Sequence, residues 1–202
     1  MQVPGEKGPK TLPPPLLMAA TETLRQLGPR RFSLTAVAET ADVSRGTVHN
    51  AFGTRDEAIA AALDQLSAAF IETMAAEVNE LGTLAEQVAA AAVLISAHRR
   101  RSAAEPRTIN QSVLVLLLEH GGDDLMQRSV ALWMPLVRAA QRRGEVDGTL
   151  DAGRAGEWIV RILFSFELLP PMRVNLDNPR AVRRFVSDHI IAGLGPRSAP
   201  RV

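Results

Sequence analysis

Residues 43–52, VSRGTVHNAF, place small polar and cationic side chains beside very little apolar surface. On a helix that begins after Ser44, Val48 and Phe52 lie four residues apart on one face. The remaining side chains suit DNA, because arginine pairs with guanine or phosphate, asparagine makes a bidentate contact to adenine, and threonine donates to phosphate. We therefore predict a DNA-reading helix that Val43, Val48 and Phe52 anchor. Its outward-facing residues are Arg45, Gly46, Thr47, His49 and Asn50.

Several of these residues also have simpler interpretations. Ser33, Thr35 and Ser44 stand at expected helix N-termini, where free backbone amides attract phosphate, yet serine and threonine are equally good N-caps. Gly46 either lets the DNA backbone come close or is a small residue against a neighbouring helix. Arg45, His49 and Asn50 either contact DNA or form an ordinary solvated face. The pattern favours the DNA contacts.

Helices must position this segment. The apolar spacing of residues 17–27 predicts a first helix that ends at Gly28-Pro29. Ser33 starts a short second helix, Ser44 starts the third, and Gly53 ends it. Thr54 starts a fourth helix, whose apolar stripe comprises Ile59, Leu63, Leu66, Phe70 and Met74.

Residues 16–63, LLMAATETLRQLGPRRFSLTAVAETADVSRGTVHNAFGTRDEAIAAAL, resemble the DNA-binding half of the tetracycline-repressor (TetR) family of bacterial transcription regulators. The similarity lies in the glycine break, the aromatic Phe32 before a capping serine, the ADVS turn, the R-G-T-V start and the G-T-R-D-E-A segment. The resemblance implies that Arg55 replaces a lysine that usually binds phosphate. His49 and Ala51 stand where the family often has tyrosines that contact the DNA backbone.

The rest of the chain also reads as helical, which gives an all-α fold of about nine helices. Apolar spacing predicts helices near residues 84–95, 126–140, 158–166 and 182–194, with a kink at Pro135 and ends at Pro170-Pro171 and Gly195-Pro196. The run VLVLLL at 113–118 fits a buried helix or a buried strand, and we expect a helix because no strand partner is evident.

The family resemblance implies a C-terminal helical domain for ligand binding and dimerisation. As ligand-binding candidates we take bulky apolar residues and two polar partners: His120, Met126, Trp133, Trp158, Arg161 and Phe164. Core packing is the alternative for the apolar four, and pairing with Glu157 is the alternative for Arg161. The last two helices would pair with a second subunit through Ile159, Leu163, Phe166, Val182, Val186 and Ile190.

Other functions lack the residues they need. The chain has no cysteine, its four histidines are isolated, and no nucleophile elbow or phosphate-binding glycine loop is present. We therefore expect no enzyme activity, no cofactor and no metal. Glu119 and His120 resemble an acid and base pair but suit a helix end better, and the arginines at 99–101 suit a solvated helix end better than a second nucleic-acid patch.

The overall charge is close to zero, so any contact with DNA must use a small, locally basic part of the surface. The net charge is +1, although residues 1–55 carry seven basic and four acidic residues. No signal peptide or long apolar run is evident, so we expect a cytoplasmic protein.

These observations predict a flexible arm (1–15), a helix-turn-helix domain (16–62), a helical ligand-binding and dimerisation domain (63–196) and a flexible tail (197–202). The expected function is that of a homodimeric transcriptional regulator, more a repressor than an activator, which a small ligand releases from double-stranded operator DNA. The alternative is a ligand-independent DNA-binding dimer, in which the C-terminal domain serves dimerisation only.

Overall fold

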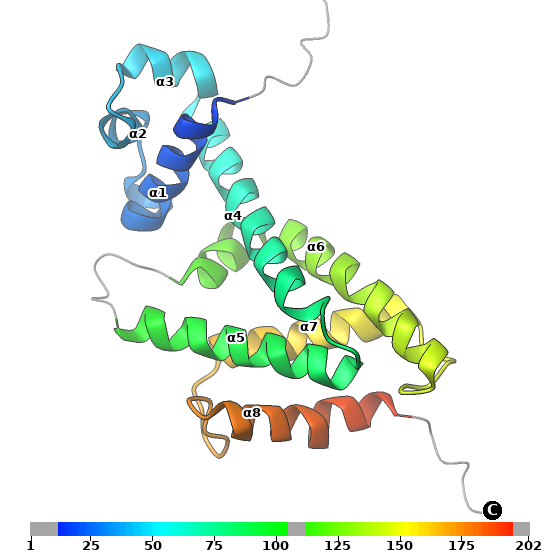
Figure 1. Cartoon of the computed structure of the whole chain (residues 1–202). Helices are drawn as coiled ribbons and strands as arrows, with labels where there is room; N and C mark the ends of the chain where they lie inside the picture. The colour runs from blue at the N-terminus through cyan, green and yellow to red at the C-terminus, as the bar shows by residue number, and fades with distance from the viewer. Residues whose placement is uncertain (1–11, 105–111, 196–202) are drawn as a thin grey trace, which may run out of the picture. The chain divides into compact units, whose positions relative to one another are not determined.

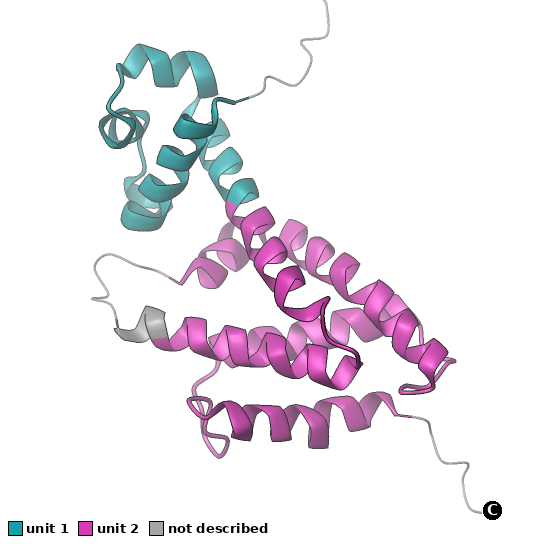
Figure 2. Cartoon of the chain, in the orientation of Figure 1, with its two compact units in different colours: residues 1–65 teal, residues 66–202 magenta. Residues whose placement is uncertain are grey.

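The computed structural model describes residues 12–104 and 112–195, with the backbone alone at 101–104. Most of the predicted arm and all of the predicted tail lie outside the described residues. The described part of the chain is helical and contains no strand, which confirms the all-α prediction. The chain divides into two compact units, residues 1–65 and 66–202 (Figure 2).

The first unit holds α1 (Pro14–Arg31), α2 (Leu34–Ala41), α3 (Arg45–Phe52) and the start of α4 (Arg55–Val78) (Figure 1). α1 begins inside the predicted arm, because prolines are tolerated in the first turn of a helix, where amides have no intrahelical partner. Gly28, with φ of 69°, interrupts the helical geometry where a break was expected, and one short turn then continues to Arg31.

The boundaries of the next helices agree with the predicted caps. The Ser33 hydroxyl accepts from the Ala36 amide at 3.1 Å, and the Ser44 hydroxyl accepts from the Thr47 amide at 3.1 Å. α3 ends at Gly53, whose φ is 81°, a left-handed value that favours glycine. These predictions hold because each cap depends on residues only three or four positions apart.

α4 begins in the first unit and ends in the second. By length and composition alone it is apolar enough to cross a membrane, with a mean hydropathy of 1.2. The helices of water-soluble proteins can pass the same test. Asp64 and Glu72 lie exposed within α4, and a bilayer core would have to bury both charges.

The second unit contains α5 (Leu84–Ala104), α6 (Val113–Arg143), α7 (Ala152–Leu168) and α8 (Pro179–Phe185). α8 continues as a π-helix (Val186–Ile191) and a 3₁₀ turn (Ala192–Leu194). The VLVLLL run is helical, as expected. It belongs to the same helix as residues 126–140, so the described residues hold eight α-helices where about nine were expected.

The break in α6 lies at Gly121 rather than at the predicted Pro135. Gly121 has φ of −152° and ψ of 30°, whereas Pro135 lies inside the helix without a comparable departure from helical geometry. A Cβ atom on Gly121 or Gly122 would meet nothing within 4 Å. Two adjacent glycines carry the largest entropic cost of staying helical, which explains why the helix breaks there.

The core of the second unit forms where α7 packs against both α5 and α6. Trp133 of α6 is 2% exposed. Gly156 of α7 lies so close to it that a Cβ added there would be 3.5 Å from the Trp133 Cβ. The small residue lets the two helix backbones approach each other, and the indole fills the space beside them.

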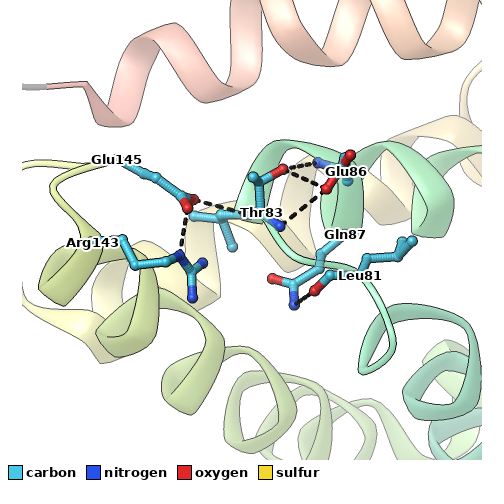
Figure 3. Close-up of polar contacts among 7 residues, drawn as sticks. Leu81, Thr83, Glu86, Gln87, Arg143 and Glu145 are labelled. Carbon is cyan, nitrogen blue, oxygen red and sulfur yellow. Dashed lines mark hydrogen bonds and ion pairs between the residues drawn. The ribbon is translucent and has the colours of Figure 1, made fainter.

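A carboxylate from the loop after α6 caps the start of α5 (Figure 3). Glu145 Oε2 accepts from the Leu84 amide at 2.9 Å, and Glu145 Oε1 accepts from Arg143 Nε at 2.5 Å. Thr83 and Glu86 complete the cap by exchanging hydrogen bonds, with the Thr83 amide donating to Glu86 Oε2 at 3.1 Å. The hydrogen bond from Arg143 lowers the pKa of Glu145, burial opposes this, and the Leu84 amide lowers it further.

We expect Glu145→Ala to lower the free energy of unfolding at pH 7 by about 0.5–2 kcal/mol, the usual cost of losing a helix cap. The folded-state pKa lies below the reference value of 4.5, so the stabilisation is present above pH 4.5 and is lost as the pH falls through the lowered pKa. Urea unfolding at pH 7 and pH 3 measures the difference, with Glu80→Ala as the control for an exposed carboxylate. A difference from wild type that persists at pH 3 would contradict this role.

Candidate nucleic-acid interface

α3 separates its apolar anchors from its polar face. Val48 and Phe52 are 0% and 6% exposed, whereas the five residues chosen as DNA contacts on this helix are all exposed. Val43 is 38% exposed, so its predicted role as a third anchor is wrong. It precedes the helix in the turn, where its side chain does not follow the buried face. Two anchors therefore hold α3.

The capping serines are already engaged within the chain. The Ser44 hydroxyl caps α3 and also lies 2.9 Å from Thr47 Oγ1, and the Ser33 hydroxyl caps α2. This supports the N-cap interpretation for both serines. Each serine satisfies one of the first-turn amides, which have no carbonyl partner within their own helix.

Gly46 has no packing role within the chain. A Cβ atom at this position would contact only the Ser44 hydroxyl, at 3.6 Å, which is an ordinary van der Waals distance. The alternative that Gly46 is small in order to fit against a neighbouring helix therefore has no support. No contact among the described residues requires glycine here.

The charge on α3 is positive only. Its eight residues include Arg45 and His49 and no acidic residue. The nearest acids in sequence, Asp42 and Asp56, lie outside α3, one in the turn before it and one in the first turn of α4, and both are exposed. The outer face of α3 thus combines one permanent cation with hydrogen-bonding groups, as base and phosphate contacts require.

Arg55, expected to contact phosphate, has partners within the chain. Its Nε atom donates to the Phe32 carbonyl at 3.0 Å, and its two Nη atoms donate to the Pro29 carbonyl and to Asp56 Oδ1. Thr54 and Glu57 form a capping box at the start of α4.

Sequence reasoning missed a polar link between α1 and α2. Thr23 is 1% exposed, and its hydroxyl lies 3.0 Å from that of Thr40. The signal was available, because Thr23 falls at helical spacing among Leu16, Ala20 and Leu24. Thr40 is exposed and its hydroxyl also donates to the Ala36 carbonyl at 2.9 Å, so it provides a partner for the buried Thr23 hydroxyl.

The six ligand-binding candidates do not form one cluster. Trp133 and Phe164 are buried in the core, and Phe164 makes an edge contact with Phe70. Arg161 is paired with Glu157 at 2.6 Å, as the alternative interpretation held, and exposed His120 lies 3.9 Å from Glu119. Met126 is half-buried on α6.

Trp158 lines a cavity in the second unit. That cavity has a volume of about 520 Å³ and is lined by Asp147, Thr149, Leu150, Asp151, Arg154, Ala155, Trp158, Gly193 and Leu194. Another cavity has a volume of about 380 Å³ and is lined mostly by apolar residues: Ser165, Phe166, Leu169, Pro170, Pro171, Met172, Arg173, Val174, Leu176 and Phe185. Both volumes fall within the usual range for small-molecule sites.

The six predicted dimer residues all pack within one chain. Ile159, Val182 and Val186 are 0% exposed, and the other three are at most 4% exposed. A fully buried side chain has no surface left for a partner, so these residues form the core of the subunit. A dimer surface on α7 and α8 must use their outer faces, where Trp158 and Ile162 are half-buried and Leu168 is 48% exposed.

Arg99 and Arg100 bind the loop before α8, instead of forming a solvated helix end or a nucleic-acid patch. Arg99 pairs with Asp177 at 3.0 Å, and Arg100 donates to the Leu176 carbonyl at 3.3 Å. Nearby, His98 Nδ1 lies 3.6 Å from Glu167 Oε2, whose side chain is 3% exposed. Burial raises the pKa of Glu167, but His98, Ser112 and Arg99 together lower it by more.

Among the residues that the structure describes, no group of three or more histidines, cysteines or acids is placed to hold a metal.

Comparison with known proteins agrees with the geometry of the first unit. Residues 16–62 match the family model described as bacterial regulatory proteins, tetR family. None of the curated proteins matches the chain by sequence. Many solved structures share the fold, and three of them illustrate it.

A TetR-family transcriptional regulator from Cytophaga hutchinsonii has a TM-score of 0.66 at 14% identity, covering 91% of this chain and 94% of that one. The regulator FadR from Bacillus subtilis, in complex with stearoyl-CoA, has a TM-score of 0.59 at 16% identity, covering 86% and 97%. A cysteine mutant of the TetR-family regulator CifR, complexed with 26-bp operator DNA, has a TM-score of 0.62 at 18% identity, covering 93% and 99%.

Proposed function

We propose that this chain, a TetR-family DNA-binding transcriptional regulator, is a cytoplasmic homodimeric repressor that a small ligand releases from its operator. The observation that carries the proposal is α3, a helix with two buried anchors and an acid-free polar face inside a helix-turn-helix unit. The major groove admits one such helix, so α3 would lie there while α2 braces against the backbone.

The proposed DNA contacts fall into two groups. Arg45 and Asn50 would read bases, whereas Thr47, His49 and Thr35 would contact the backbone together with the amides at the N-termini of α2 and α3, which Ser33 and Ser44 cap. Gly46 would let the sugar–phosphate chain approach the helix. Because His49 and Ala51 replace tyrosines that often contact the DNA backbone in the family, binding would depend more on base contacts and on the second subunit of the dimer.

Dimerisation would use the outer faces of α7 and α8, because their inner faces are occupied by the core. Two heads would then contact half-sites about one helical turn apart, roughly 34–36 Å, or a greater distance when ligand is bound.

Ligand release is supported by the 380 Å³ apolar cavity in the second unit, and the ligand-bound FadR shows that a protein of this fold binds an acyl-CoA. α4 is the covalent connection between the units, so a ligand that shifts α4 would change the separation of the heads. Ligand and DNA must then weaken each other's binding by the same factor. The ligand-independent dimer is the alternative.

Selection of bound duplexes from a random pool tests the DNA-binding proposal. We expect a recurring palindrome whose half-sites lie about one helical turn apart. Selection of no sequence would reject sequence-specific binding, and a single unrepeated half-site would reject the symmetric dimer. The affinity for the selected duplex is then measured in the presence of acyl-CoA thioesters and other apolar acids. If none of these compounds changes the affinity, the ligand-independent alternative is favoured over release by ligands of these chemical classes.

Gly46→Ala separates folding from DNA binding. Alanine is favoured over glycine in a helix by roughly 0.5–1 kcal/mol, so we expect the variant to be slightly more stable. A methyl group on the DNA-facing side should nevertheless weaken binding to the selected duplex. Thermal unfolding and fluorescence anisotropy measure the two effects, and a variant that binds as tightly as wild type would contradict a close approach at Gly46.

A further inference from the structure

Arg55, the first residue of α4, uses all three of its guanidinium nitrogens within the first unit. Nε donates to the Phe32 carbonyl at 3.0 Å, one Nη donates to the Pro29 carbonyl, and the other donates to Asp56 at 3.1 Å. The side chain is 44% exposed, so the ion pair with Asp56 contributes little to stability. The hydrogen bonds from two guanidinium nitrogens to two carbonyls, which we call the fork, fix the orientation of the side chain.

Both carbonyls lie at the end of α1. After the break at Gly28, the helix makes a last turn at residues 29–31 and is capped by Phe32. Carbonyls in the last turn of a helix have no partner within it, and that end carries partial negative charge. A guanidinium both donates hydrogen bonds to these carbonyls and places a positive charge beside the negative end of the helix. The same cation is unfavourable at the start of its own helix, α4, so its electrostatic benefit lies at the end of α1.

The chain enters the helix-turn-helix directly from this corner, because Ser33, next to Phe32, caps α2. Resting on the proposed function, we infer that Arg55 is a positioning residue that fastens the start of α4 to the α1–α2 corner. The helix-turn-helix and the first turn of α4 then move as one body. Thr54 and Glu57 cap the same first turn of α4, and α4 itself continues into the second unit.

Lysine distinguishes this role from a phosphate contact. A lysine keeps the charge and binds phosphate well, but its single nitrogen cannot reproduce the fork to two carbonyls. We expect both Arg55→Lys and Arg55→Ala to bind the duplex selected by wild type about tenfold more weakly, since hydrogen bonds to a charged group are lost. Arg31→Ala serves as the control that removes one positive charge from the same corner without removing the fork.

The opposite result has a clear signature. If Arg55 contacts phosphate, Arg55→Lys binds like wild type, and Arg55→Ala reduces the slope of log affinity against log salt by about 0.9. That outcome overturns the inference, as does wild-type affinity in both variants. Circular dichroism of each variant at the assay temperature establishes that the compared proteins are folded.

Hydrogen exchange on the free, full-length chain provides a readout that does not require DNA. We expect Arg55→Lys to speed exchange of the amides at residues 32–37 about tenfold and to leave α5 unchanged. Arg55→Gln, which keeps one amide donor, should have an intermediate effect if alanine does not fold. Unchanged exchange at the corner overturns the inference even if the chain proves to bind DNA, and faster exchange supports it even if no operator is found.

Discussion

A chain that carries both Arg45→Ala and Asn50→Ala is expected to bind its selected duplex little more tightly than unrelated DNA. A bidentate contact to a base contributes about 1–3 kcal/mol to discrimination, so two contacts that act independently amount to about 2–6 kcal/mol. Both side chains are exposed on α3, away from Val48 and Phe52, and their removal should leave the fold intact.

Anisotropy titrations at one fixed salt concentration, with selected and scrambled duplexes, measure this loss. The single variants show whether the two effects add. Arg142→Ala with Asn79→Ala is the matched control, because it removes the same side-chain types from exposed positions in the second unit. A double variant that retains its preference for the selected duplex would mean that another surface reads the DNA.

Trp133→Ala is expected to lower the free energy of unfolding by about 3–5 kcal/mol, the usual cost of truncating a buried aromatic residue. The indole is 2% exposed. The adjacent residue Gly156 has no side chain that could fill the cavity left by its removal. The loss falls on the contact between α6 and α7, the most extensive one between helices of the second unit.

Urea unfolding followed by circular dichroism measures this loss. Trp158→Ala is the matched control, because that indole is half-buried beside Gly193 and lines the 520 Å³ cavity, so its removal should cost less. An equal or greater cost at Trp158 would contradict the assignment of Trp133 to the core and of Trp158 to a more open site.

The local signals in the sequence were reliable where their cause is local. Ser33, Ser44 and Gly53 mark helix ends because a cap involves the nearest turn alone, and the helical spacing of Val48 and Phe52 determines which side of α3 is buried. Val43 was misjudged because it lies outside the helix, where that spacing no longer applies.

Side-chain spacing on α7 and α8 identified apolar faces but not what covers them. Ile159, Leu163 and Phe166 suit a subunit interface and a subunit core equally well, since either removes apolar surface from water. The packing of α5 and α6 against α7 assigns them to the core. The same ambiguity applies to Trp133 and Phe164, which are predicted as ligand contacts, because a buried side chain can belong to a core or line a ligand site.

By itself, the sequence determined the helices, most of their ends, the all-α class and the polar face of α3, because each depends on residues within a few turns of one another. Only the tertiary structure decided which polar groups meet across long stretches of chain. Arg55 reaches Phe32, Glu145 reaches Leu84, and Arg99 reaches Asp177, at separations of 23, 61 and 78 residues. Each of these contacts joins a charged group to a helix end or a distant loop, and no periodic pattern records such a pairing because it exists only once the helices have packed.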